Sequence, residues 1–425
     1  MKAASPKGRL ELTWMGKDMA LIPSAEGRYD YEWVRPDDPR VLEVRPIEVL
    51  RQVGDRDAAT DNLLVVGDSG DALRSLGTVP EWADRYLGQV KLVYLDPPFN
   101  TAQVFEHYAD QLEHSVWLTM MRDRIRHLKP LLAQDASIWI HLDDAEVHRM
   151  RLLMDEEFGP DAFVCTIVWE KTPTRENRTD ISRSQDYILV YAPAGRAAWK
   201  SVRNLLPPSA SQLALYRNPD NDPRGPWASM PMHAMAEKGR RQSQFFTVVT
   251  PSGREVVPPP GRCWRFTEER YRAMVTEDRI WFGSDGTNAP RLKKFLVEVQ
   301  QGLVPRSWWP NTEVGTTGEA RDEVLRLFPG SPFSTPKPER LLRRILQIGS
   351  DPGDLVLDYF AGSGTTAAVA HKMGRRWLTI ELQRSTVERF VEPRLAKVVA
   401  GADEGGITSR SERVMAPPPP PPPPP

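Results

Sequence analysis

The feature that most restricts the fold is a short apolar stretch that ends abruptly. Residues 90–95 read VKLVYL and continue directly into Asp96, Pro97, Pro98 and Phe99. Neither proline has an N–H group to donate, so a β-strand over 90–95 cannot extend through them in a sheet ladder. The chain must leave this strand in a fixed, extended conformation. At that exit it presents a carboxylate, proline carbonyls and an aromatic ring, which makes these four residues candidates for a functional site.

Strands and helices alternate on both sides of this stretch. Apolar runs typical of strands occur in NLLVV, QVKLVYL, ASIWIHL, FVCTIVW and DYILVYA. Apolar residues at helical spacing cover 115–133, and AEVHRMRLLMDEEF predicts a second helix that ends at Gly159. This alternation predicts an α/β fold with a parallel or mostly parallel sheet.

One interruption of the alternation divides the chain. Residues 201–330 are rich in proline and glycine, with scattered arginine, tryptophan and methionine. We therefore predict an N-terminal extension over 1–55, two parts of one α/β domain over 56–200 and 331–400, and a separate inserted region over 201–330. Residues 401–425 form a tail whose last nine residues are prolines. Such a run adopts polyproline II structure and cannot join a core.

A glycine turn follows the first strand after the interruption. An apolar strand that ends at Asp358 is followed by Gly362 and Gly364. These glycines let the backbone turn tightly and approach a ligand closely, and a helix starting near Thr365 would point its N–H groups at that ligand. Glu381 ends the next predicted strand, at the position where an acid binds a ribose diol in doubly wound folds. The segment therefore predicts a nucleoside cofactor.

The details of the turn distinguish between cofactors. No Lys-Ser or Lys-Thr pair follows the glycines, which excludes a phosphate-binding P-loop. The third glycine of the dinucleotide fingerprint is also missing, which disfavours an NAD-binding oxidoreductase. With Phe360 beside the turn, the pattern suits S-adenosylmethionine better than NAD.

Taken as a pair, DPPF (96–99) and FAGSG (360–364) resemble motifs of the DNA amino-methyltransferases, which methylate the exocyclic amine of adenine or cytosine. Their order along the chain resembles the beta, circularly permuted class. LELTWMGK, LDPPFNT, SRSQDYILVYA and TPKPERLLRRIL are similar to modification subunits of Type III restriction systems, over residues 8–407. The resemblance implies a Rossmann-like S-adenosylmethionine-dependent methyltransferase fold, circularly permuted. Residues 201–330 would then be a target-recognition region between the catalytic half (56–200) and the cofactor-binding half (331–400).

The resemblance also implies roles for single residues. The catalytic motif is Asp96, Pro97, Pro98 and Phe99. The cofactor-binding residues it implies are Asp68, Asp96, Lys337, Asp358, Phe360, Gly362, Gly364, Thr365 and Glu381. Asp68 enters because a strand followed by Gly-Asp resembles the third cofactor motif, and Lys337 enters through TPKPERLL, which resembles the tenth.

The implied activity is methyl transfer from S-adenosylmethionine to the N6 amine of adenine in duplex DNA, within a restriction-modification or related system. A leading Asp in the catalytic motif is associated with adenine, and N4 methylation of cytosine remains the nearest alternative. No Pro-Cys nucleophile motif is needed for attack by an amine, and its absence argues against methylation of cytosine C5. A different class of function stays open: a DNA-specificity subunit of a restriction complex without methylation activity. The expected partners are double-stranded DNA, a second copy of the chain and a restriction (helicase–nuclease) subunit.

The distribution of charge favours nucleic acid as the partner. The whole chain has a net charge of −1, but residues 171–309 hold 22 Lys and Arg against 13 Asp and Glu, a local excess of +9. A basic middle in an otherwise acidic chain is typical of a surface that binds phosphates.

The remaining composition indicates an ordinary intracellular protein. Cys165 and Cys263, and the histidines His107, His114 and His141, have no metal-ligand spacing, so no metal is expected. No apolar run approaches the length of a membrane span, and the N-terminus lacks a signal-peptide core. We therefore expect a cytoplasmic protein with no membrane association.

Overall fold

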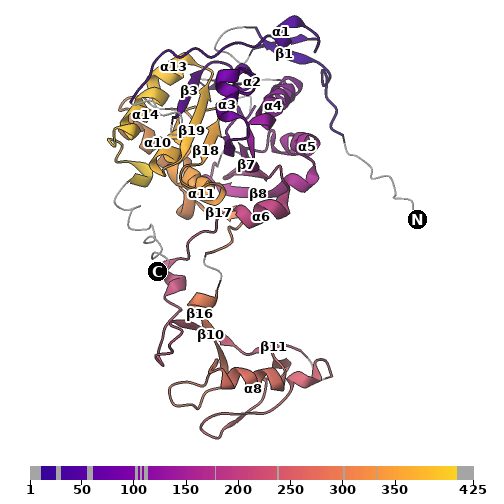
Figure 1. Ribbon diagram of the computed structural model, residues 1–425, viewed down its shortest axis with the longest axis vertical. Coiled ribbons are helices and arrows are strands. Elements are labelled where there is room, and N and C mark those ends of the chain that lie inside the picture. The colour runs from indigo at the N-terminus through magenta and orange to yellow at the C-terminus, as the bar shows by residue number, and fades with distance from the viewer. Residues whose placement is uncertain are drawn as a thin grey trace, which may run out of the picture. The chain divides into compact units, whose positions relative to one another are not determined.

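The chain divides into two units, residues 1–204 with 305–425 and residues 205–304. The computed structural model describes residues 11–24, 30–54, 61–100, 104–105, 108–109, 113–177, 179–236, 239–299, 302–331 and 333–408. Figure 1 shows both units. The smaller unit covers fewer residues than the inserted region of 201–330 expected from the sequence. Residues 305–331 belong to the larger unit because they return to its sheet through a short strand.

The larger unit is built on one sheet of eight strands. In spatial order these are β17 (Trp308–Trp309), β8 (Phe163–Glu170), β9 (Gln185–Tyr191), β7 (Leu132–Leu142), β4 (Val90–Leu95), β18 (Leu355–Asp358), β19 (Arg376–Glu381) and β3 (Leu63–Val66). Every pairing is parallel except the two made by β9, which is antiparallel to β7 and to β8. The expectation of a mostly parallel α/β sheet is confirmed.

Strands β4 and β18 lie side by side at the centre of this sheet. They pair in parallel, with Leu357 opposite Val93, although the inserted unit separates them in the chain. Both are almost wholly buried, as expected for parallel strands covered by helices on both faces. Their carboxyl ends therefore bring Asp96 and Asp358 to the same edge of the sheet.

The helices of the larger unit fall into two packed groups. One comprises α2 (Ser69–Thr78), α3 (Pro80–Tyr86), α4 (His114–Leu128) and α5 (Val147–Phe158), and the other comprises α11 (Glu339–Gly349), α12 (Thr365–Lys372) and α14 (Glu392–Val399). Figure 1 shows the first group in purple and the second in orange to yellow. The other α-helices described in this unit are α1 (Pro39–Leu42), α6 (Arg196–Val202), α9 (Asn311–Val314), α10 (Thr317–Leu327) and α13 (Arg384–Thr386).

Two helix ends illustrate how local sequence sets the boundaries. The helix expected over 115–133 ends at Leu128, because Pro130 shifts the chain into one 3₁₀ turn and β7 begins at Leu132. A helix cannot place a proline in its interior without losing a hydrogen bond. Helix α5 ends where expected, at Gly159, whose positive φ of 82° is a conformation that glycine adopts readily.

The N-terminal extension contains a hairpin. β1 (Ala20–Pro23) and β2 (Tyr31–Val34) pair in antiparallel fashion and pack near α4. The Arg122 guanidinium of α4 is buried and donates hydrogen bonds to the carbonyls of Lys17 and Met19. This part of the extension is thus attached to the larger unit.

The smaller unit consists of short antiparallel strands and one longer helix. Its strands are β10 (Trp227–Pro231), β11 (His233–Met235), β12 (Val248–Val249), β13 (Glu255–Val256), β14 (Arg262–Trp264), β15 (Ile280–Trp281) and β16 (Arg291–Phe295), and its helices are α7 (Ala210–Leu213) and α8 (Glu268–Thr276). A small core formed by Met232, Val248, Trp264, Tyr271, Met274 and Ile280 holds it together. The unit has a core of its own and is not a loop.

Two further points complete the architecture. A small hairpin, β5 (Val104–Phe105) with β6 (Tyr108–Ala109), follows the catalytic motif. The prolines of the tail, 417–425, lie outside the described residues. Within the described ranges, no helix combines the length and apolar character needed to cross a membrane.

Candidate active site

A cavity of about 350 Å³ opens at the carboxyl edge of the sheet, where β4, β18 and β19 end. Its wall includes most of the residues singled out in the sequence: Asp96, Pro97, Pro98, Phe99, Lys337, Asp358, Phe360, Gly362, Thr365 and Glu381. Residues from the two halves of the domain thus meet around one space. We call this space the sheet-edge pocket.

The catalytic motif enters the pocket directly after β4. Asp96 pairs through its Oδ2 atom with the ammonium group of Lys337, while its Oδ1 atom is buried and has no hydrogen-bond partner among the described residues. The carbonyl of Pro98 accepts a hydrogen bond of 2.8 Å from the indole N–H of Trp117, a fully buried residue of α4. The Asp96 carboxylate therefore sits on a backbone that is anchored to the core.

Phe99 lies against two side chains of the pocket wall. Its ring centroid is 5.7 Å from the ring of His141, and the Lys337 ammonium lies 5.0 Å from the same centroid. Phe99 is only partly buried. An aromatic ring held in this way can offer a face to a flat ligand.

The glycine turn has the backbone conformation that its sequence predicts. Gly362 and Gly364 have φ values of 53° and 74°. A Cβ atom on Gly364 would lie 3.1 Å from a Val391 methyl carbon, so a side chain there is both strained and crowded. Gly364 caps α12, which begins at Thr365 and points its free N–H groups back toward the turn.

Two buried acids flank this turn. Asp358 accepts a hydrogen bond of 3.0 Å from the backbone N–H of Phe360, and Glu381 accepts bonds of 2.9 and 3.0 Å from those of Gly362 and Gln383. Burial raises the pKa of Asp358 and of Glu381 to about 7 each, against the lowering effect of these hydrogen bonds. Both acids are thus close to the point of gaining or losing a proton at neutral pH.

Asp68 is not brought to the sheet-edge pocket. Its carboxylate accepts hydrogen bonds from the backbone N–H groups of Gly70 and Asp71 and so caps α2. It also pairs with the buried guanidinium of Arg124. Asp68 lines a different cavity, of about 430 Å³, next to the N-terminal hairpin. Its oxygens are occupied by structural partners.

Four side chains that the sequence did not single out for function form a hydrogen-bonded chain beside the pocket. The Tyr94 hydroxyl is 2.8 Å from His141 Nδ1, His141 Nε2 is 3.2 Å from Asp186 Oδ2, and the Lys171 ammonium is 2.7 Å from Asp186 Oδ1. Tyr94, Lys171 and Asp186 line the pocket, and His141 is completely buried behind Phe99. The histidines have no metal-ligand spacing in the sequence, so the sequence predicts an ordinary role for His141.

The protonation of this chain follows from burial. Desolvation lowers the pKa of His141 and raises that of Tyr94, so the imidazole and the phenol are both neutral at pH 7. The imidazole then donates through Nε2 to Asp186 and accepts from Tyr94 at Nδ1. The position of His141 in its strand could have indicated a role at this site, because His141 lies near the carboxyl end of β7, next to β4.

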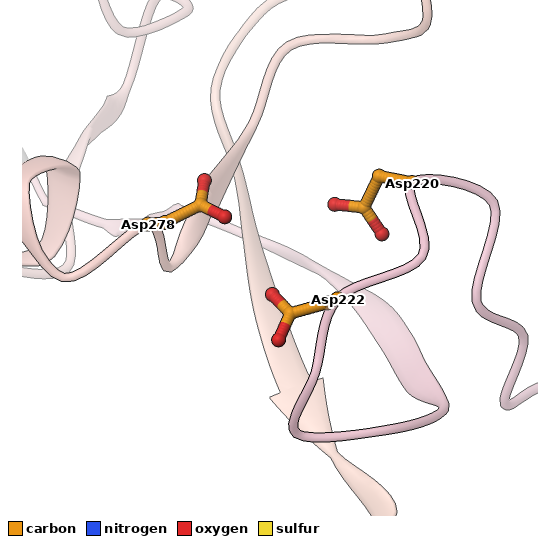
Figure 2. Close-up of side chains that lie close together, drawn as sticks. All are labelled: Asp220, Asp222 and Asp278. Carbon is orange, nitrogen blue, oxygen red and sulfur yellow. The ribbon is translucent and has the colours of Figure 1, made fainter.

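A cluster of three acids in the smaller unit has the appearance of a cation site. Figure 2 shows Asp220, Asp222 and Asp278 facing one another, close enough for one oxygen of each to share an ion. The buried ammonium of Lys293 already lies among them, at 2.6, 3.3 and 3.0 Å from their respective carboxylate oxygens. The lysine takes the place of a metal ion, and the cluster is explained as a structural ion network.

Fold and site together define the class. A mostly parallel sheet with an acid-flanked glycine turn at its carboxyl edge is a Rossmann-like methyltransferase fold. The strand before the DPPF motif precedes the glycine turn in the chain, which is the circularly permuted order. The family follows from comparison with known proteins: the model of the DNA methylase family (N6_N4_Mtase) matches residues 90–392. The chain belongs to this family.

Individual relatives include both Type III and Type II restriction-modification proteins. The chain is 31% identical to the Type III StyLTI Mod subunit of Salmonella typhimurium over 72% of its own length and 49% of the relative's. It is 28% identical to the Type II methyltransferase M.EcaI of Enterobacter cloacae, over 69% of this chain and 62% of that one. The chain therefore spans about half the length of the Type III relative and under two thirds of the Type II relative.

Among solved structures, one similar protein is TTHA0409 of Thermus thermophilus, a putative DNA modification methylase complexed with S-adenosyl-L-methionine. It is 19% identical, with a TM-score of 0.40, over 80% of this chain and 96% of that one.

Proposed function

We propose that this chain is an S-adenosylmethionine-dependent methyltransferase that modifies the N6 amine of adenine in duplex DNA as part of a restriction-modification system. The observation that carries the proposal is the meeting of Asp96 and Phe99 with the glycine turn around a single pocket. Membership of the DNA methylase family and the Mod and Type II methyltransferase relatives support it.

The cofactor half of the pocket fits a nucleoside that carries a positive charge. S-adenosylmethionine, when bound, supplies the electrophilic methyl group. Glu381 would accept hydrogen bonds from ribose hydroxyls, and Asp358, Phe360 and Thr365 line the same pocket. The glycines Gly362 and Gly364 keep side chains out of the turn, so the backbone itself can approach the cofactor.

The target half has to activate a poor nucleophile. The lone pair of the adenine amine is delocalised into the ring, so acceptors must hold its two N–H bonds in a tetrahedral arrangement. The Asp96 carboxylate and the Pro97 carbonyl would accept these bonds and leave the lone pair free to take the methyl group. The carbon–sulfur bond would break as the carbon–nitrogen bond forms, and one amine proton would pass to the Asp96 carboxylate and on to water. Positioning and aimed acceptors are the main catalytic contributions.

Phe99 provides the surface for the extruded base. The amine of a paired adenine cannot be reached inside the duplex, so the base must flip out. Stacking on an aromatic ring contributes about 1–3 kcal/mol per base. The exposed part of Phe99, backed by His141, supplies that ring.

Target recognition is proposed for the inserted region of 201–330, and the basic charge of this part of the chain supports the proposal. Residues 205–304 hold 14 Lys and Arg against 10 Asp and Glu, a net +4, and residues 171–204 hold 7 against 3, another +4. Contacts from these basic segments to phosphates predict an affinity for DNA that falls steeply with salt concentration, measured by filter binding or anisotropy. An affinity independent of salt would contradict this assignment.

The assembly is also a proposal. Type III names among the relatives support a restriction (helicase–nuclease) partner, and DNA as substrate supports a cytoplasmic location. A homodimer stays a prediction, to be tested by the mass of the protein in solution.

The decisive experiment identifies the product. Duplex DNA is incubated with the protein and S-adenosylmethionine, digested to nucleosides and weighed by mass spectrometry, with the Asp96→Ala variant as the control. N6-methyladenine is expected from the wild-type protein. N4-methylcytosine would instead establish cytosine as the target base. That result would contradict the association of a leading Asp, here Asp96, with adenine. DNA binding with no methylated nucleoside would favour a specificity subunit that lacks methylation activity.

A further inference from the structure

Lys337 contacts the catalytic motif. Its ammonium group pairs with Asp96 Oδ2 and lies 5.0 Å from the centroid of the Phe99 ring. The side chain is 8% exposed, so most of its charge is removed from water. Both of its contacts are to residues that the proposed function places at the methyl acceptor.

The backbone around Lys337 is fixed before it reaches Asp96. Pro336 and Pro338 flank it, and a residue that precedes proline is restricted to extended conformations. Pro338 caps α11, and the next residue, Glu339, is buried and ion-paired with both Lys372 and Arg394. Little conformational freedom therefore remains to be lost when the lysine engages the carboxylate.

The two oxygens of Asp96 are in different states. Oδ2 is occupied by Lys337, and Oδ1 is buried with no hydrogen-bond partner among the described residues. A buried acceptor without a donor is unfavourable. An amine N–H of the target base would supply the missing donor while the lysine kept its own oxygen.

We propose that Lys337 is a positioning residue for Asp96 and not a ligand of the cofactor. It holds the carboxylate by one oxygen and leaves the other for the target amine. This inference rests on the proposed methyl transfer and assigns Lys337 to the acceptor side of the site. The lysine also balances the charge of Asp96, so the pair is close to neutral when a sulfonium cation enters the pocket.

The charge of Lys337 allows a test that distinguishes a positioning role from a cofactor-binding role. In Lys337→Met, Asp96 loses its counter-charge, so the affinity for cationic S-adenosylmethionine should rise about tenfold relative to neutral S-adenosylhomocysteine. Both affinities are measured by calorimetry on the full chain. If Lys337 bound the cofactor directly, its replacement would lower the affinity for both compounds alike, and that result would overturn the inference. The exposed lysine variant Lys200→Met is the matched control and should change neither affinity.

The second readout is the rate of one turnover on DNA. Lys337→Met should lower it about a hundredfold, because a misplaced carboxylate no longer holds the amine. Asp96→Asn and the double variant complete a cycle: once Asp96 has lost its charge, removing Lys337 should cost less than threefold. Losses that simply multiply would show that the two residues act separately and would contradict the inference.

Folding and function are controlled separately. Binding of S-adenosylhomocysteine to each variant shows that the pocket is formed, and Lys337→Arg should recover part of the rate because it keeps the charge. If the wild-type protein transfers no methyl group to DNA, the proposed function fails. The ratio of the two cofactor affinities still decides whether Lys337 acts on Asp96.

Discussion

Two groups of three acids, one in each unit, show how differently the same residue types are used. In the sheet-edge pocket, Asp358 and Glu381 are buried and their pKa values are raised to about 7, and Asp96 has one lysine partner. In the smaller unit, Asp220, Asp222 and Asp278 surround the Lys293 ammonium, and Arg224 adds a second cation to Asp222.

The difference lies in what satisfies the carboxylates. Hydrogen bonds from Arg224 are the main cause that lowers the pKa of Asp222, and all three carboxylates already have the Lys293 ammonium as a partner. At the sheet edge the acids are satisfied mainly by backbone N–H groups, and one oxygen of Asp96 has no partner among the described residues. Only the acids of the sheet-edge pocket therefore retain the capacity to bind a ligand. The following predictions test this contrast, in order of decreasing effect.

Asp96→Ala should produce the largest effect. Loss of a positioned electrostatic contact of this kind costs roughly 3–4 kcal/mol, or about a thousandfold in the rate of methyl transfer. The measurement is transfer of labelled methyl groups to DNA, with the exposed variant Asp84→Ala as control. A wild-type rate for Asp96→Ala would show that the DPPF motif is only a turn.

Lys293→Met should destabilise the smaller unit. Removing the buried ammonium takes the shared cation away from three carboxylates, of which Asp222 keeps Arg224, and this should lower the free energy of unfolding by about 3 kcal/mol. Denaturant unfolding measures the change, and the exposed neighbour Lys294→Met is the matched control.

The same variant sharpens the comparison further, because it should turn the structural cluster into a cation site. Millimolar Ca²⁺ should recover part of the stability of Lys293→Met and leave the wild-type protein unchanged. An undiminished unfolding free energy would mean that the three acids do not depend on the lysine.

Glu381→Gln should weaken cofactor binding by about thirtyfold. The substitution removes a charged acceptor, and a hydrogen bond to a charged group contributes about 1.5–3 kcal/mol. Calorimetry with S-adenosylmethionine measures the loss, and exposed Glu388→Gln serves as the control. Equal affinity in Glu381→Gln would place the ribose elsewhere.

The smallest expected effect is that of pH on the wild-type protein. Because the pKa of Glu381 is about 7 and hydroxyl donors favour the ionised form, affinity for the cofactor should rise about tenfold from pH 6 to pH 8. The pH dependence of folding stability has the opposite sign, because the raised pKa of Glu381 means that the folded state binds the proton more tightly than the unfolded state. The unfolding free energy of the cofactor-free protein should therefore fall as pH rises from about 4.5 to about 7. If cofactor affinity did not change with pH in the wild-type protein or in Glu381→Gln, Glu381 would not be the group whose ionisation controls binding.

Local sequence predicted the elements that depend on backbone chemistry. Proline ended β4, Gly159 ended α5, and the two glycines formed the turn before α12, because φ restrictions act within a few residues. The loss of alternation predicts an inserted region over 201–330, and the structure has the edges of the smaller unit at 205 and 304. Those edges depend on where the returning strand β17 pairs with β8.

The sequence by itself determined the mostly parallel sheet and the residues that lie at its carboxyl edge. Strand periodicity and strand ends are local properties, so Asp96 and Asp358 could be placed there without coordinates. Tertiary structure alone decided that Lys337 pairs with Asp96, that Asp68 is taken up by Arg124, and that Lys293 fills the three-acid cluster. The physical reason is that an ion pair between residues far apart in the chain depends on strand register and helix packing, which no local pattern specifies.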